Sequence, residues 1–210
     1  MKKPQKLLRD IFGFDEFRLG QREIIDAVSS KKNVLAIMPT GGGKSLCFQL
    51  PALMSEGLTV VISPLIALMR DQVRGLQAAG VAAGALTSVN TEDETDAVFS
   101  EIYAGKLKIL YVAPERLASS AMQSALFRFN VTSLVVDEAH CVSQWGHDFR
   151  PDYLRIGELR KSLGVPLAAF TATADKETRK EITERLFDGV APKVFLHGFD
   201  RPNIYLSFAV

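Results

Sequence analysis

The chain has 210 residues, of which 47% are hydrophobic and 23% are charged, and its formal net charge is +1. These values are those of an ordinary globular protein with room for one α/β domain and a substantial core. They exclude a strongly basic chain, so any contact with nucleic acid must come from a local patch of charge.

The first part of the chain predicts two short helices, at residues 6–12 and 21–28, with a polar and aromatic stretch between them. The amide of Gln21 has the donor and the acceptor that pair with an adenine edge, and a ring such as Phe14 or the guanidinium of Arg18 has a plane that stacks on the base. The alternative is a polar helix cap with both phenylalanines of the stretch in the core, and composition favours neither.

Residues 38–45, Met-Pro-Thr-Gly-Gly-Gly-Lys-Ser, lie between an apolar run at 34–37 that predicts a buried strand and a run at 46–50 that predicts the start of a helix. Strand, glycine loop and helix is the order of a phosphate cradle, in which backbone N–H groups and a helix N-terminus hold a polyanion. Lys44 is then placed to reach the β- and γ-phosphates, and Ser45 to offer its hydroxyl to Mg²⁺. Met38 replaces the first glycine of the usual pattern, which marks a subclass; the alternative is a chance glycine-rich turn. The predicted cradle consists of Thr40, Gly41, Gly42, Gly43, Lys44 and Ser45.

The middle of the chain alternates between apolar runs and helical periodicity. Thr87 and Ser88 end one such run and are interpreted as turn residues or as contacts to a phosphate backbone. Thr91 and Glu94 form a capping box that predicts the start of a helix. We expect strands at residues 58–62, 82–86 and 108–112, and helices at 65–79, 91–103 and 119–127.

A further apolar run at 133–136 predicts a buried strand that ends in Asp137, Glu138, Ala139 and His140. An aspartate at the carboxyl end of a parallel strand beside a phosphate loop can hold Mg²⁺, and the adjacent glutamate can orient and polarise the attacking water. Two acidic residues also occur by chance at a solvated strand end. Because a phosphate loop precedes them in the same α/β pattern, the catalytic interpretation is the stronger one.

Residues 141–153 follow directly and hold the only tryptophan of the chain, Trp145, among other aromatic, arginine and histidine side chains. Exposed aromatics interleaved with cations suit stacking on the bases of single-stranded nucleic acid. The alternative is a packed loop with Trp145 as a core anchor, and composition leaves the two about equal.

The last elements are predicted to be two helices and two strands. Thr171 and Thr173 follow one of these strands and are expected either to relay the state of the nucleotide or to cap the next helix. The alternation along the whole chain predicts an α/β fold with a mainly parallel sheet, helices on both faces, and one nucleotide site at the carboxyl ends of the strands. The elements are helices at 153–163 and 175–187 and strands at 166–170 and 194–196.

The two cysteines, Cys47 and Cys141, are far apart and argue against a disulfide framework. A reducing compartment is expected, the cytoplasm or, in a eukaryote, the nucleus. The basic N-terminus is not followed by a secretory apolar run and no stretch is long enough to span a bilayer, so we expect no membrane partner.

Seven motifs follow one another along the chain. They are residues 17–21 (FRLGQ), 38–45 (MPTGGGKS), 63–72 (SPLIALMRDQ), 113–117 (APERL), 137–150 (DEAHCVSQWGHDFR), 171–174 (TATA) and 199–203 (FDRPN). Together, and in this order, they resemble the first motor domain of the RecQ helicases. The aromatic-rich loop, residues 141–150, is the most discriminating part, because related helicases share the phosphate loop but not that sequence.

The resemblance covers nearly the whole chain and implies a RecA-like P-loop NTPase fold of DEAH-box type. It also implies unwinding of DNA in the 3′ to 5′ direction with ATP and Mg²⁺, in DNA repair or recombination.

Residue by residue, the resemblance implies that Gln21 and Arg18 contact adenine. Phe14 stacks on it, at a position where the family often has tyrosine. The roles argued above for the phosphate loop and the acidic pair carry over unchanged.

The resemblance also implies a path from the nucleotide to DNA. His140 and Gln144 couple the nucleotide to the aromatic-rich loop. Within that loop, Trp145, Phe149 and Arg150 sense single-stranded DNA.

By the same resemblance, residues 1–30 carry the adenine motif, 31–198 form the first RecA-like ATP-binding domain, and 199–210 start a linker. A RecQ motor needs a second RecA-like domain to close over ATP and supply an arginine finger, and the family usually adds a zinc module and a winged helix for duplex DNA. None of these is expected within the 210 residues, so we expect a motor lobe that is nearly inactive alone. Two alternatives stay open: an RNA helicase of the same superfamily, and a stand-alone nucleotide-binding module.

Overall fold

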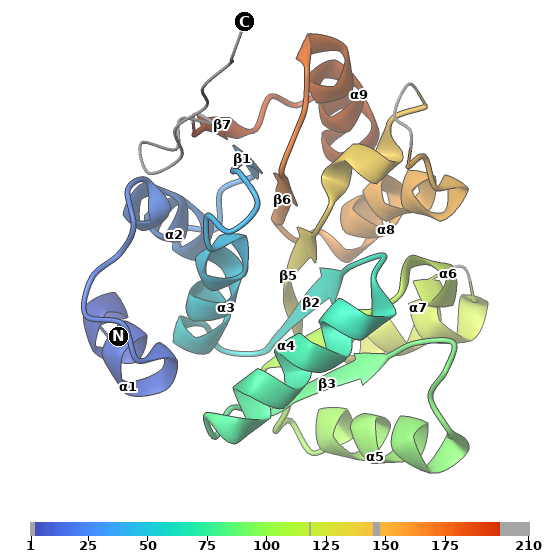
Figure 1. The fold of residues 1–210 in the computed structure, drawn as a ribbon. Helices are drawn as coiled ribbons and strands as arrows, with labels where there is room; N and C mark the ends of the chain where they lie inside the picture. Colours follow the sequence, from blue (N-terminus) through green and yellow to red (C-terminus); the bar gives the residue numbers. More distant parts are fainter. Residues whose placement is uncertain (1–2, 118, 145–147, 198–210) are drawn as a thin grey trace, which may run out of the picture.

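The computed structural model describes residues 3–117, 119–144 and 148–197. Within these residues seven strands form one sheet, in the order β3-β4-β2-β5-β6-β1-β7, and every neighbouring pair is parallel (Figure 1). The predicted α/β class with a parallel sheet is confirmed. The strands are β1 (Val34–Ile37), β2 (Leu58–Ile62), β3 (Ala83–Leu86), β4 (Ile109–Val112), β5 (Val131–Val136), β6 (Leu167–Thr171) and β7 (Lys193–Leu196).

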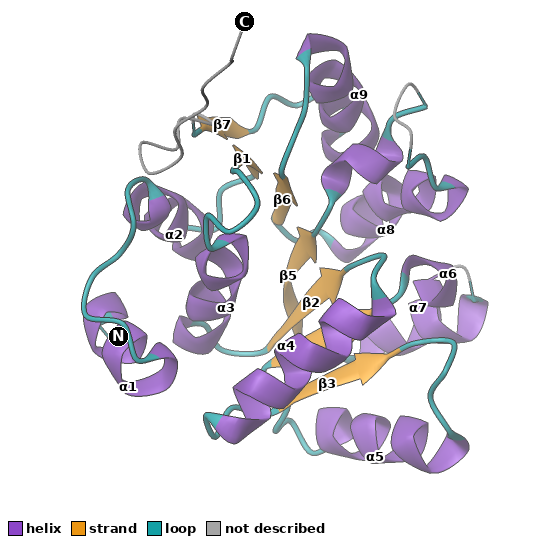
Figure 2. Cartoon of the chain, viewed as in Figure 1, coloured by secondary structure: helices purple, strands orange, loops and turns teal. Residues whose placement is uncertain are grey.

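Helices cover both faces of the sheet (Figure 2), and each face has its own hydrophobic core. Alternate residues of β1 point to opposite cores: Val34 and Ala36 pack with the first four helices, and Leu35 packs with the last five. A strand that is buried on both faces has to be apolar at every position, which is why its run was readable in the sequence. The helices are α1 (Pro4–Phe12), α2 (Gln21–Ser29), α3 (Lys44–Met54) and α4 (Ile66–Ala78) on one face, and α5 (Glu92–Tyr103), α6 (Pro114–Leu117), α7 (Ser120–Arg128), α8 (Ile156–Leu163) and α9 (Lys176–Phe187) on the other.

The N-terminal helices α1 and α2 are part of the core that also contains α3 and α4. Leu8 of α1 and Ile24 and Ile25 of α2 are fully buried in the same cluster as the residues of α3. The described part of residues 1–30 is therefore packed against the helix that follows the phosphate loop. The domain boundaries inferred from the resemblance stay predictions, and the linker at 199–210 lies outside the described residues.

Several element boundaries differ from the sequence-based expectation, most of them by one or two residues. α3 begins at Lys44, two residues earlier than predicted, because Gly43 takes a left-handed conformation (φ 78°) and ends the loop there. β5 begins at Val131 rather than at residue 133. The helix predicted from residue 153 begins as the 3₁₀ turn η2 (Pro151–Arg155), and a second 3₁₀ turn, η1 (Ala139–Val142), follows the acidic pair.

Both cysteines, Cys47 and Cys141, are buried and free. Among the described helices, none is long and apolar enough to cross a bilayer.

Candidate nucleotide-binding site

Four strands bring the motif residues to one edge of the sheet. β2, β5, β6 and β1 are neighbours in that order, and because they are parallel their carboxyl ends lie side by side (Figure 1). Ser63 follows β2, Asp137 follows β5, Thr171 ends β6 and Met38 follows β1. The backbone N–H of Asp137 donates to the carbonyl of Ile62 (2.8 Å), and that of Met38 to Thr171 (3.0 Å). Motifs that are far apart in the sequence therefore meet at one site.

The phosphate loop has the backbone that a cradle requires. Gly41 and Gly43 have positive φ (80° and 78°), a conformation that side chains with a Cβ disfavour. A Cβ on Gly43 would also lie 2.3 Å from the side-chain nitrogen of Gln21. Lys44 and Ser45 are half-buried in the first turn of α3, where unpaired N–H groups and the helix dipole favour an anion.

The predicted adenine residues contact this loop from α2 and the turn before it. The Gln21 amide is buried and donates to the carbonyls of Gly43 (Nε2–O 3.2 Å) and Gly42 (3.4 Å), and its Oε1 accepts from the backbone N–H of Arg18 (2.8 Å). The Arg18 guanidinium donates to the carbonyl of Gly41. Sequence reasoning assigned Gln21 to adenine alone and missed that its amide braces the phosphate loop.

A small pocket of about 100 Å³ opens beside this brace and is lined by Phe14, Arg18, Gln21 and Gly43, with two further residues. Phe14 is 51% exposed, so the interpretation that placed it in the core is wrong. That interpretation holds for Phe17, which packs against the core. The three residues predicted to hold adenine thus converge at the loop predicted to hold phosphates.

The acidic pair lies beside the loop. The Asp137 carboxylate is 8% exposed and accepts from the Glu138 N–H (3.0 Å) and the Ser63 hydroxyl (3.5 Å). Burial, and then the Glu138 charge, raise the pKa of Asp137 to about 6, while nearby Lys44 acts to lower it. Oxygen donors around a buried and incompletely neutralised negative charge fit a hard divalent cation such as Mg²⁺, with Asp137 and Ser45 as the residues to hold it.

We expect Asp137→Asn to stabilise the metal-free protein at neutral pH. The pKa of the carboxyl rises from 3.8 to about 6 on folding. Stability from its bound proton is therefore full below about pH 4 and is lost as the pH rises to about 6. At about 1.4 kcal/mol for each pH unit, the variant should gain up to roughly 3 kcal/mol over the wild type above pH 6.

Denaturant unfolding with a chelator at pH 4, 5, 6 and 7.5 measures this difference between variant and wild type. Asp96→Asn, at an exposed position on α5, is the matched control. A variant that is less stable than the wild type at pH 7.5, or a difference that does not change with pH, would contradict the expected burial of the charge.

Glu138 has a left-handed backbone (φ 48°, ψ 49°), which costs a residue with a side chain on the order of 1–2 kcal/mol. This conformation turns the chain from β5 into η1 and leaves the Glu138 side chain 21% exposed beside His140 (Oε2–Nδ1 3.4 Å). Nothing in the sequence indicated this strained backbone. Among the described residues other than glycine, Lys31 and Asp188 share this conformation, and its occurrence at the predicted catalytic glutamate agrees with a functional position.

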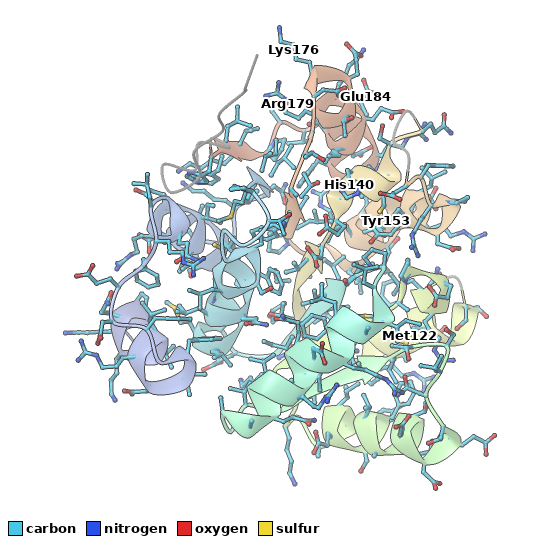
Figure 3. The ribbon with its side chains drawn as sticks, viewed as in Figure 1. Met122, His140, Tyr153, Lys176, Arg179 and Glu184 are labelled. Atoms are coloured by element: carbon cyan, nitrogen blue, oxygen red, sulfur yellow. The ribbon has the colours of Figure 1, made fainter. Side chains whose placement is uncertain are left out.

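His140, labelled in Figure 3, connects its own turn η1 with the end of β6 and with the aromatic-rich loop. Its Nδ1 lies 2.9 Å from the Thr171 hydroxyl, which itself donates to the carbonyl of Thr173 (3.0 Å). The hydroxyl therefore accepts from Nδ1–H, which fixes the tautomer of the ring. Nε2 lies 3.6 Å from the carboxylate of Asp148 in the aromatic-rich loop. Thr171 thus has the geometry of a relay, while the cap of α9 is supplied by Asp175 instead.

Tyr153 is a supporting residue that sequence reasoning missed. Its ring is fully buried under the acidic motif (Figure 3), and its hydroxyl donates to the backbone carbonyl of Asp137 (3.1 Å). It lies in η2, directly after the aromatic-rich loop, so only its proximity in sequence to that loop hinted at a role.

The predicted DNA-sensing residues lie at the ends of the aromatic-rich loop. Gln144 is exposed at its start, and Phe149 is half-buried and Arg150 exposed at its end. The Arg150 guanidinium donates to the carbonyl of Pro64 (3.4 Å), after β2. Trp145 lies outside the described residues, so its two interpretations stay predictions.

The turn after β3 buries one of its two hydroxyl residues. Thr87 is buried, and its hydroxyl donates to the side-chain oxygen of Asn90 (2.6 Å). The turn interpretation holds for Thr87, while Ser88 is exposed and its contact with a phosphate backbone stays a prediction.

Residues 18–182, which include the phosphate loop and the acidic motif, match the family model of the DEAD/DEAH box helicases. The chain belongs to the DEAD/DEAH box helicase family. In this family the acidic motif gives the name, and here it reads Asp137-Glu138-Ala139-His140.

Within the family, the resemblance to RecQ helicases is confirmed. This DEAD/DEAH box chain is 48% identical over 199 residues to the ATP-dependent DNA helicase RecQ of Pasteurella multocida, and 45% identical over 207 residues to that of Haemophilus influenzae. It is 45% identical over 208 residues to the probable ATP-dependent DNA helicase RecS of Bacillus subtilis. These alignments cover 94%, 97% and 98% of the chain but only 31%, 33% and 41% of the relatives, so the chain spans about a third of their length.

Solved helicase structures share the fold. The helicase MrfA has a TM-score of 0.71 at 20% identity, over 93% of this chain and 32% of that one. The Hef helicase domain of Pyrococcus furiosus has a TM-score of 0.65 at 20% identity, over 85% of this chain and 38% of that one. At these identities the likeness shows the fold alone, and the expected RecA-like helicase fold is confirmed.

Proposed function

We propose that this chain is the first motor domain of a RecQ-type helicase that uses ATP to unwind DNA in the 3′ to 5′ direction, in DNA repair or recombination. The observation that carries the proposal is the position of His140, between the strand end at Thr171 and the aromatic-rich loop at Asp148. That arrangement joins the nucleotide site to a segment suited to single-stranded DNA. The relatives named as ATP-dependent DNA helicases support the same assignment.

At the nucleotide site, each residue has one task. The loop N–H groups and the Lys44 ammonium bind the phosphates, and Gln21 and Arg18 place adenine against Phe14. Glu138 orients the attacking water and takes its proton on the carboxylate. Asp137 and Ser45 would hold Mg²⁺, which would supply positive charge to neutralise the phosphates.

The coupling to DNA runs through His140. A change at the γ-phosphate alters the surroundings of Glu138 and, 3.4 Å away, of the His140 ring. Movement of the His140 ring then reaches Asp148, 3.6 Å from Nε2, and with it the loop whose Gln144, Trp145, Phe149 and Arg150 contact single-stranded DNA.

Completion of the site requires a partner domain. A second RecA-like domain of the same protein supplies an arginine finger, a group worth roughly 10³ to 10⁵ in turnover in related nucleotide hydrolases. A helicase of this kind acts in the compartment that contains DNA, which is the cytoplasm in bacteria and the nucleus in eukaryotes.

The test compares the full-length gene product with the 210-residue chain. Phosphate release is measured without nucleic acid, with single-stranded DNA and with single-stranded RNA, and unwinding is measured on duplexes with a 3′ or a 5′ tail. We expect DNA to stimulate the full-length protein, 3′-tailed duplexes to be unwound, and the 210-residue chain to bind ATP weakly with almost no turnover.

Three outcomes would contradict the proposal. A preference for RNA would indicate an RNA helicase, and a full-length protein without turnover would indicate a nucleotide-binding module. DNA-stimulated turnover by the 210-residue chain alone would mean that a group within the chain, or a second copy of it, completes the site.

A further inference from the structure

A half-buried carboxylate outside the motifs holds the start of the aromatic-rich loop. Glu181 lies on α9, with 15% of its side chain exposed, and one of its oxygens accepts two hydrogen bonds. The donors are the hydroxyl of Ser143 (2.5 Å) and the backbone N–H of Gln144 (3.0 Å). Both donors lie at the point where the chain leaves η1 for the loop. The carboxylate thus binds the loop entrance directly.

The helix that carries this carboxylate, α9, is anchored in the core. Ile182, the next residue, is fully buried, and Leu186 and Phe187 on the same helix are buried in the same core. The helix begins at a side-chain cap from Asp175. The Arg185 guanidinium lies 3.8 Å from the other oxygen of Glu181 and leaves the bonded oxygen to the loop.

Segment 140–144 is therefore held at two points by one continuous stretch of chain. At its start, His140 contacts Thr171 at the end of β6, and at its end Gln144 contacts Glu181 on the helix that follows β6. A hydrogen bond to a charged acceptor is about twice as strong as one between neutral groups, which suits a fixed anchor. The direction in which the loop leaves the acidic motif is set by these two contacts.

We propose that Glu181 is a positioning residue for the coupling between DNA and ATP hydrolysis. Glu181 holds the backbone of Gln144 and, through it, the position of the loop relative to His140. In this role it does not contact the nucleotide. The proposal rests on the proposed helicase function. It assigns a role to a helix that none of the seven motifs includes.

The test uses three variants of the full-length protein. Glu181→Ala removes the acceptor, and Glu181→Gln keeps an oxygen that can accept both bonds. Glu184→Ala is the matched control, because Glu184 lies on the same helix (Figure 3) and its side chain is 58% exposed. Its one ion pair among the described residues is with Lys180, at 4.0 Å. For each variant the ATP dissociation constant, the maximal DNA-stimulated rate and the melting temperature are measured.

We expect Glu181→Ala to lower the maximal DNA-stimulated rate about tenfold, as misplacement of a supporting group does, with the ATP dissociation constant within about twofold of wild type. Glu181→Gln should restore most of the rate, and Glu184→Ala should match wild type. A wild-type rate in Glu181→Ala, or a joint loss of ATP binding and melting temperature that Gln does not rescue, would overturn the positioning role. If the wild type itself shows no stimulation by DNA, the proposed function fails, and this inference fails with it.

Discussion

Replacing Lys44 with alanine is expected to lower DNA-stimulated ATP hydrolysis by the full-length protein on the order of 10³-fold. Lys44 is the first residue of α3, at the end of the glycine loop, where its ammonium adds a full charge to the helix N-terminus. The charge of Lys44 also acts to lower the pKa of Asp137. Alanine therefore removes the phosphate contact and leaves the buried carboxylate with less compensation, which disfavours its charged form.

Phosphate release with saturating single-stranded DNA, together with ATP binding, measures this loss. Lys106→Ala is the control, because Lys106 is exposed in the connection between α5 and β4. Turnover by Lys44→Ala within about threefold of wild type, less than a single preorganised donor is usually worth, would mean that the loop is not the phosphate site.

Replacing Glu138 with glutamine is expected to lower hydrolysis by roughly 10² to 10⁴ while ATP binding is retained, since a general base contributes about that factor. Glutamine has the same shape but cannot take a proton from water. The Glu138 charge raises the pKa of Asp137, so its removal lowers that pKa and favours the ionised carboxylate that Mg²⁺ needs. Binding of Mg²⁺ and ATP should accordingly be unchanged or tighter, in contrast to Lys44→Ala.

The measurement is single-turnover hydrolysis next to equilibrium binding of ATP in the presence of Mg²⁺. Glu101→Gln, at an exposed position on α5 outside the seven motifs, controls for the loss of one negative charge. Loss of ATP binding in Glu138→Gln would show a structural role for the strained residue, and retained hydrolysis would show that another group activates the water.

Local patterns predicted much of the fold. The strands at 34–37 and 58–62 were predicted at their observed bounds, since strands covered on both faces need continuous apolar runs. The capping box of Thr91 and Glu94 was predicted from two side chains and is present in full. Predicted boundaries differ from the observed ones where the backbone of a single residue decides them. The left-handed backbone of Gly43, for example, makes α3 begin at Lys44.

The sequence by itself determined the chemistry: a glycine loop with Lys44 and Ser45, an acidic pair after a buried strand, and an aromatic-rich loop. These features depend on neighbours in the chain, so local spacing reveals them. Only the tertiary structure decided which of them touch, because the strand order β2-β5-β6-β1 is not encoded in any local periodicity. The contacts of His140 with Thr171 and of Glu181 with Gln144 join residues more than 30 positions apart, and packing of the two cores, rather than any motif, brings them together.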